Sequence, residues 1–198
     1  MKVVARRGFA ATVDEIAKVS GVSPRTIFRH YSNHDLLIAS TVKDMYEACG
    51  QRPIEGLAQP TDDLEGWIDG LAFTIHTRNA EIVGDAFWDI HAPRHNASAA
   101  LSELDTFRRE YRNRGVRHLV GVAWQTAGGK GDPPEDLTMA FALNFSAFTT
   151  QALMVDFDQT PGQIATLTAS LLKVLLHRAV DAQASDRSDD ATVDVAGH

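Results

Sequence analysis

The stretch of residues 12–31, TVDEIAKVSGVSPRTIFRHY, constrains the fold more than any other part of this chain. Thr12 is a favourable N-cap, and Glu15, three residues later, completes a capping box. One apolar face follows at helical spacing and consists of Val13, Ile16 and Ala17. Gly21 suits the left-handed conformation that ends many helices. These residues predict a first helix that begins after Thr12 and ends near residue 20.

A second helix is predicted directly after this turn. Ser23 is its cap, and Pro24 fits its first position because proline lacks only an N–H that has no partner there. The side chains predicted to point inward are Val22, Ile27, Phe28 and Tyr31. The side chains predicted to point outward are Arg25, Thr26, Arg29 and His30. The outer face of this helix is therefore expected to be polar and basic.

A helix with a basic outer face can enter the major groove of DNA. Arginine can donate two hydrogen bonds to a guanine, and threonine can bond a base or contact a thymine methyl group. Free N–H groups at the start of such a helix can bind a phosphate. We interpret the stretch as a DNA-binding helix-turn-helix whose candidate contacts are Thr12, Ser23, Pro24, Arg25, Thr26, Arg29, His30, Tyr31 and His34. The alternative is an ordinary helical hairpin with a solvated polar face.

A specific set of positions recurs over residues 7–40: Gly8-Phe9, Thr12, Ile16-Ala17, Gly21-Val22-Ser23, Thr26-Ile27-Phe28, His30-Tyr31 and Leu36-Leu37. In these positions the chain resembles the DNA-binding domain of TetR-family transcriptional regulators. The resemblance implies an all-helical homodimer. It also implies that a small N-terminal domain binds a palindromic DNA operator, and that a larger C-terminal domain binds a small molecule and dimerises.

Three features depart from the family pattern. Only residues 1–7 precede Gly8, where the family usually has a full helix, so either the recorded start is internal to a longer reading frame or the domain is short of core. The interval from Gly8 to Ile16 is one residue shorter than usual. Phe28 and His34 replace an aromatic hydroxyl and a lysine that often bind phosphate. We expect DNA binding that is weaker, or more dependent on pH, than is usual in the family.

The charge of the chain is unevenly distributed. Its formal net charge is −7, but residues 1–34 hold six basic and two acidic residues, a net charge of +4. The remaining residues therefore carry −11. Because salt largely screens charges beyond ~8 Å under physiological conditions, a basic N-terminal region can attract DNA despite an acidic body.

The sequence favours a cytoplasmic protein that is not an enzyme. Cys49 is the lone cysteine, so no internal disulfide can form, which suits a reducing compartment. The N-terminal residues do not resemble a signal peptide, and no stretch approaches the ~20 apolar residues of a membrane span. Because no nucleophile–base signature is present, we expect neither catalysis nor a cofactor.

Four possible metal ligands lie close together near the middle of the sequence. His91 and His95 are four residues apart, and Asp85 and Asp89 lie nearby. Pro93 stands between the two histidines and prevents a regular helix, so the spacing does not place them on one face. We therefore expect no metal, and a metal-dependent hydrolase is the least favoured function.

The chain is predicted to be all-α with three regions. These are a helix-turn-helix DNA-binding domain at residues 1–48, a helical effector-binding and dimerisation domain at 49–182, and a disordered tail at 183–198. The helices predicted between the helix-turn-helix and the C-terminal pair span about 33–48, 62–79, 81–91 and 97–126. A linker is expected at 51–60 and a loop at 128–134.

Two C-terminal helices are predicted to form the homodimer. The first is apolar at Leu137, Phe141, Phe145, Phe148 and Ala152, and on further sides at Met139, Ala142 and Met154. The second is apolar at Ile164, Leu167, Leu171, Val174 and Leu175. A helix that is apolar most of the way around needs several neighbours, which a four-helix bundle from two subunits supplies. The alternative is a monomer that buries both helices in its own core.

The helices between these regions are expected to bind the effector. Candidate lining residues are Phe73, His76, Phe87, Trp88, His91, Phe107, Tyr111 and Trp124, although aromatic residues at helical spacing can equally be core. We predict a ligand-responsive DNA-binding regulator, a repressor released from its operator by a small hydrophobic or aromatic effector. The alternative is an all-helical protein-interaction or small-molecule sensor module with a degraded DNA-binding head.

Overall fold

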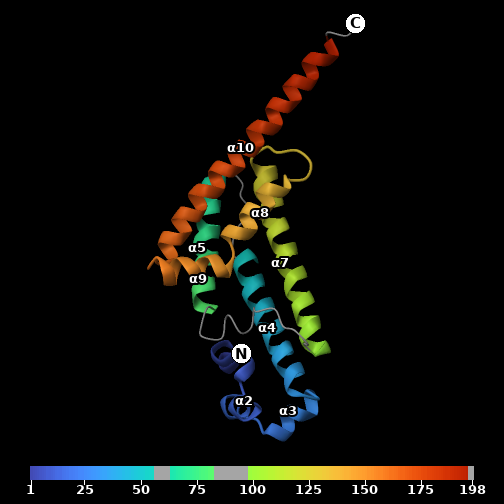
Figure 1. The fold of residues 1–198 in the computed structure, drawn as a ribbon, viewed down its shortest axis with the longest axis vertical. Helices are drawn as coiled ribbons and strands as arrows, with labels where there is room; N and C mark the ends of the chain where they lie inside the picture. The colour runs from blue at the N-terminus through green and yellow to red at the C-terminus, as the bar shows by residue number, and fades with distance from the viewer. Residues whose placement is uncertain (56–62, 83–97, 196–198) are drawn as a thin grey trace. The chain divides into compact units, whose positions relative to one another are not determined.

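The computed structural model describes residues 1–55, 63–82 and 98–195, and the regular structure of these residues is entirely helical. Figure 1 shows the order of the helices along the chain. The chain divides into two compact units: unit 1 comprises residues 1–54 and 78–112, and unit 2 comprises residues 55–77 and 113–198. The predicted all-α fold class is confirmed. No helix within the described ranges is both long enough and apolar enough to cross a membrane.

Unit 1 begins with four short elements followed by a long helix. They are α1 (Lys2–Arg7), the 3-10 helix η1 (Gly8–Ala10), α2 (Val13–Ser20), α3 (Pro24–His30) and α4 (His34–Glu55). Figure 1 shows α2 and α3 side by side next to the start of α4. The two buried clusters that hold these elements together are Val3, Val4, Ala11, Ile38, Ala39, Val42, Leu101 and Leu104, and Ala17, Ile27 and Leu37.

The short helix α1 contributes to the core of unit 1 despite its length. Val3 is 7% exposed and Val4 is 1% exposed. Both belong to the same buried cluster as Leu101 and Leu104 of α7 (Ala99–Thr126). The expected shortage of core is therefore offset, because a helix far along the chain covers the apolar side of α1 and α4.

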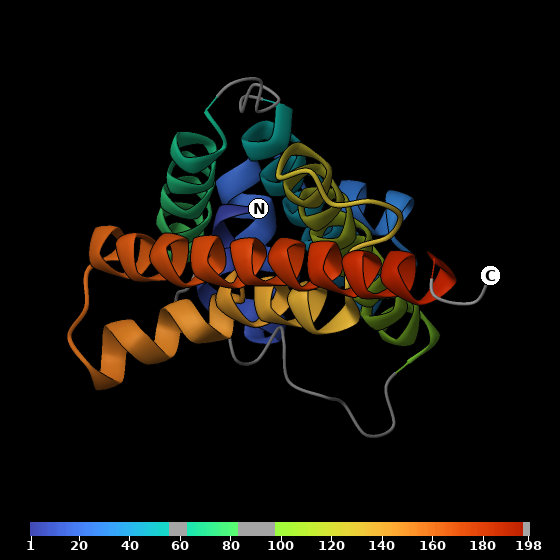
Figure 2. The same cartoon turned by 90° about the horizontal axis from the view of Figure 1, so that it is seen from above.

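Unit 2 is built from α5 (Leu64–Ile82) up to residue 77, the second half of α7, α8 (Glu135–Asn144), α9 (Ala147–Asp156) and α10 (Pro161–Val195). Figure 2 shows α10 running alongside α8 and α9. The buried cluster of this unit is Ile68, Leu71, Ala72, Leu119, Val120, Ala123, Trp124, Leu137, Phe141, Phe145, Ala165, Ala169, Leu172 and Leu176.

Several predicted boundaries are wrong. α4 continues through Gly50 to Glu55, into the predicted linker, because a glycine inside a helix costs only about 1 kcal/mol and need not end it. α5 continues past residue 79 to Ile82, and most of the helix predicted at 81–91 lies outside the described residues. The loop predicted at 128–134 is confirmed.

The C-terminal pair of helices also differs from the prediction. The first is split into α8 and α9, because Ser146 leaves the helical conformation and its hydroxyl accepts a hydrogen bond from the Phe148 N–H at 3.2 Å. In place of a disordered tail, α10 continues as a helix to Val195, since extending an existing helix is easier than nucleating one. Gln183 also exchanges two hydrogen bonds, both of 2.9 Å, with the backbone of Lys130.

Candidate nucleic-acid interface

The start of α2 is held by a capping box, as predicted. The Thr12 hydroxyl accepts a hydrogen bond from the Glu15 N–H at 3.2 Å, and the Thr12 N–H donates to Glu15 Oε2 at 2.9 Å. The backbone and side-chain hydrogen bonds from Thr12 lower the pKa of the Glu15 carboxyl, with help from Arg7, whose Nε lies 3.7 Å from Glu15 Oε1. Because the Thr12 hydroxyl also donates to Glu15, the structure gives Thr12 a capping role.

The turn between α2 and α3 also has the predicted geometry. Gly21 has φ 71° and ψ 18°, a left-handed conformation that costs little only for glycine. The Ser23 hydroxyl accepts a hydrogen bond from the Thr26 N–H at 3.1 Å and lies 3.0 Å from the Thr26 hydroxyl. Pro24 begins α3. The left-handed turn therefore ends α2, and the Ser23 cap starts α3 two residues later.

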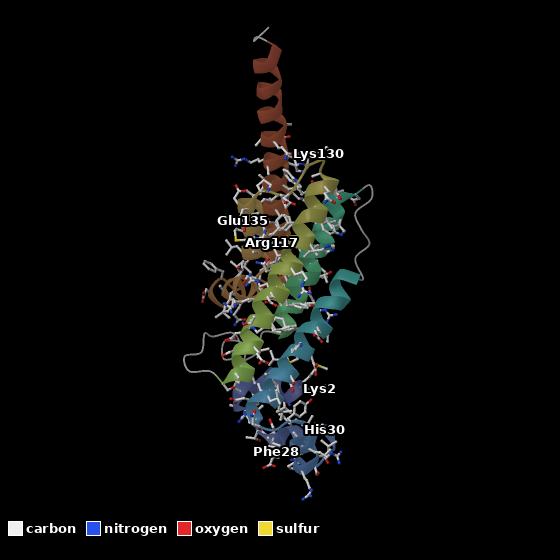
Figure 3. All side chains as sticks on the ribbon, turned by 90° about the vertical axis from the view of Figure 1, so that its right-hand side faces the viewer. Lys2, Phe28, His30, Arg117, Lys130 and Glu135 are labelled. Carbon is white, nitrogen blue, oxygen red and sulfur yellow. The ribbon has the colours of Figure 1, made fainter. Side chains whose placement is uncertain are left out.

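The outward face of α3 carries exposed positive charge. Arg25, Arg29 and His30 are exposed, and Thr26 is half-buried. Figure 3 shows His30 and Phe28 in the α2–α3 part of unit 1. Within the residues that the structure describes, no ion pair is recorded for Arg25 or Arg29. Both guanidinium groups are therefore available to an external anion.

Two side chains that were predicted to point inward are exposed. Phe28 is 52% exposed and Val22 is 41% exposed. α3 contacts the rest of the unit through Ile27, which is 6% exposed, with Tyr31 partly buried beside it. Successive residues of a helix are rotated by about 100°, so Phe28 points roughly a quarter turn away from Ile27. Because the buried side of this seven-residue helix is narrow, the Phe28 side chain is exposed to solvent.

His34 occupies the first position of α4 and holds two segments of unit 1 together. Its Nε2 lies 2.7 Å from the carbonyl oxygen of Ala11, and its Nδ1 lies 3.8 Å from Asp35 Oδ1. A carbonyl oxygen can only accept, so Nε2 carries the hydrogen. Because this N–H donates to the Ala11 carbonyl oxygen, it is not available to a phosphate. The role of His34 in this structure is therefore to hold the start of α4 to the segment before α2.

The predicted effector residues fall in both units. His76 and Trp124 are fully buried in unit 2, where Phe73 is 57% exposed. Phe107 and Tyr111 belong to unit 1, and their ring centroids are 5.6 Å apart. Phe87, Trp88 and His91 lie outside the described residues, as do Asp85, Asp89 and His95. No group of three or more possible metal ligands occurs among the residues that were described. The shared effector cavity stays a prediction.

His76 is the best-defined polar group in the core of unit 2. Its Nδ1 lies 2.9 Å from the Thr150 hydroxyl, and its Nε2 lies 3.0 Å from the Thr168 hydroxyl. Burial lowers the pKa of His76 to about 4, because the charged imidazolium loses its hydration. The side chain is therefore neutral at physiological pH and joins three helices, α5, α9 and α10.

A contact between α4 and α7 was not anticipated from the sequence. Arg108 Nε donates to the Tyr46 hydroxyl at 3.3 Å, and Arg108 Nη1 lies 2.9 Å from Asp105 Oδ1. Lys43 Nζ lies 4.9 Å from the ring centroid of Phe107. From the sequence, Lys43 and Tyr46 could be expected to share one face of a helix. That spacing does not indicate which residue, about sixty positions later in the chain, contacts this face.

The capped helix-turn-helix and the exposed arginines of α3 are features typical of a DNA-binding helix-turn-helix. Residues 1–41 match the family model described as bacterial regulatory proteins, tetR family. This segment of the chain is similar to that family of regulatory proteins, which supports a role in DNA binding and transcriptional regulation. The matched segment includes α1 and ends within α4. No curated protein and no solved structure matches the chain significantly.

Proposed function

We propose that the chain is a ligand-responsive repressor, released from a palindromic operator when a small hydrophobic or aromatic effector binds. The observation that carries the DNA-binding part is the outward face of α3, where Arg25 and Arg29 are exposed and free of recorded ion pairs in the described residues. The intact capping box and turn argue against a degraded head, because they hold that face in position.

In this proposal the residues predicted to contact DNA divide into two groups. Arg25, Arg29, Thr26 and His30 contact base edges and phosphates, since their side chains lie on the outward face. Ser23, Pro24, Tyr31, Thr12 and His34 position the helix or contact the phosphate backbone at its edges. Loss of the first group should change sequence preference, whereas loss of the second should weaken binding to all sequences.

A homodimer is proposed through α8 and α10. In unit 2, Leu137, Phe141 and Ile164 are buried in the core of the unit, but other apolar side chains on the same helices are exposed. The exposed set consists of Met139, Leu143, Leu167, Leu171, Val174 and Leu175. Exposed apolar faces of this kind mark protein interaction sites, and two half-sites one helical turn apart require two recognition helices.

The effector response is proposed as a shift between two conformations. α4 begins at His34, which bonds Ala11 in the head, and reaches Tyr46, which bonds Arg108 on α7. An effector that binds one arrangement of these helices more tightly than the other would change the operator affinity by the same factor. The composition of the predicted lining favours an apolar effector with few polar groups.

The test is a gel shift with DNA that flanks the gene for this chain. We expect Arg25→Ala and Arg29→Ala each to weaken binding about five- to 150-fold, as about 1–3 kcal/mol per base contact implies. Arg114→Ala is a matched control, because Arg114 is an exposed arginine of α7 outside the helix-turn-helix. Equal binding by all three variants would contradict the proposal that the outward face of α3 contacts DNA.

A further inference from the structure

Phe28 is a large apolar side chain on the polar face of α3. It is 52% exposed, while its neighbour Ile27 is 6% exposed. Within the described residues its ring makes no recorded stacking or cation–π contact. A half-exposed aromatic ring on a recognition helix is unfavourable in water, so a partner that covers it would add binding free energy.

The neighbours of Phe28 indicate which partner covers it. Arg25 precedes Phe28 by three residues and therefore lies beside it on the helix surface, and Arg29 follows it directly. Both arginines are exposed, so the ring lies within a positively charged surface. That charge is complementary to DNA, and it disfavours a second protein surface of the same charge.

Phenylalanine has no hydrogen-bonding group, which limits what it can recognise in DNA. It cannot bond a phosphate oxygen or the polar edge of a base. The major groove offers one apolar group for direct contact, the C5 methyl of thymine. Figure 3 shows Phe28 in the part of unit 1 that carries the recognition face.

We propose that Phe28 contacts a thymine methyl group in each operator half-site and so determines sequence specificity at that base pair. This inference rests on the proposed operator binding. The contact would bury one methyl group and part of the ring in each half-site. Burial of one methyl contributes about a four-fold change in affinity, so two half-sites together would give roughly fifteen-fold.

The experiment begins with selection of duplexes that bind the wild-type full-length chain from a randomised pool. Each thymine of the selected half-site is then replaced by deoxyuridine, which removes only the methyl group. Binding is measured for the wild type, Phe28→Ala and Phe28→Leu. Val19→Ala is the matched control, because Val19 is 58% exposed in the same unit but lies on α2.

We expect one thymine position at which deoxyuridine in both half-sites weakens wild-type binding by roughly fifteen-fold. Phe28→Ala should bind thymine and deoxyuridine duplexes equally at that position, Phe28→Leu should keep part of the preference, and Val19→Ala should keep all of it. If Phe28→Ala retains the full preference, or if no thymine is sensitive, the contact is overturned while operator binding stands. If no duplex is selected, operator binding and this contact are both overturned.

Discussion

The hydroxyl of Thr168 lies 3.0 Å from Nε2 of His76, although 92 residues separate them in the chain. On the other side of the ring, Thr150 lies 2.9 Å from Nδ1, and the Thr150 hydroxyl also donates to the Ser146 carbonyl oxygen at 3.2 Å. The network therefore assigns the ring hydrogen to Nδ1, and Nε2 accepts from Thr168. A neutral histidine satisfies both partners, whereas a protonated one would lose the bond from Thr168.

The first prediction concerns the pH dependence of stability. The pKa of His76 falls to about 4 in the folded chain, against about 6.5 when unfolded, so the unfolded state binds the proton more tightly. The stabilisation that neutral His76 gives the folded chain is fully present above about pH 6.5 and is lost as the pH falls towards 4. We expect a loss of about 3 kcal/mol, at 1.36 kcal/mol per pKa unit.

Urea unfolding of the wild type and His76→Gln at pH 7, 5.5 and 4 measures this loss. Glutamine can donate and accept hydrogen bonds but does not titrate in this range. The wild-type free energy of unfolding should therefore fall relative to that of the variant by about 3 kcal/mol between pH 7 and pH 4. A difference that is independent of pH would show that His76 is not the group responsible.

The second prediction isolates the bond between His76 and Thr168. Thr168→Val removes the donor and leaves a buried imidazole nitrogen without a partner, so the free energy of unfolding should fall by about 1–3 kcal/mol. Thr166→Val is the control, because Thr166 lies on the same helix but is exposed. The control should change stability by no more than about 0.5 kcal/mol. Equal losses in the two variants would mean that helix propensity, not the buried bond, sets the cost.

The third prediction concerns Gly129, which is buried under the ring of Trp124. A Cβ at this position would lie 2.2 Å from two carbons of the indole, so Gly129→Ala should lower the free energy of unfolding by about 1–3 kcal/mol. Gly121→Ala has no atom within 4 Å of the new Cβ and lies inside α7, so it should be neutral or stabilising by up to about 1 kcal/mol. Denaturant unfolding of both variants gives the comparison, and a tolerated Gly129→Ala would contradict the packing.

The fourth prediction tests the proposed dimer. Leu171 is 45% exposed on α10, and a charge placed there would be buried without a partner in a four-helix interface. We expect sedimentation at micromolar concentration to give about twice 21.6 kDa for the wild type and about 21.6 kDa for Leu171→Asp. Val155→Asp should remain dimeric, because Val155 is also an exposed apolar residue, at 62%, but lies on α9. A monomeric wild type would refute the dimer.

The local features of the helix-turn-helix were predictable from the sequence. Thr12 and Glu15 cap each other across three residues, and the Ser23 hydroxyl accepts a hydrogen bond from the Thr26 N–H over the same separation. Gly21 ends α2 because glycine, which has no Cβ, adopts the left-handed backbone conformation at little cost. Such contacts close within one helical turn, so their partners are adjacent in the chain and a short motif specifies them. The family match over residues 1–41 covers the same segment.

What the tertiary structure decided is which side of each helix is covered. Phe28 and Ile27 are adjacent apolar residues, but only Ile27 meets Ala17 and Leu37, so Phe28 remains exposed. Likewise, His76 is polar and could have been at the surface, but Thr150 and Thr168 approach it from two remote helices. Periodicity identifies the faces of a helix, whereas burial depends on partners whose separation in the chain no local pattern encodes.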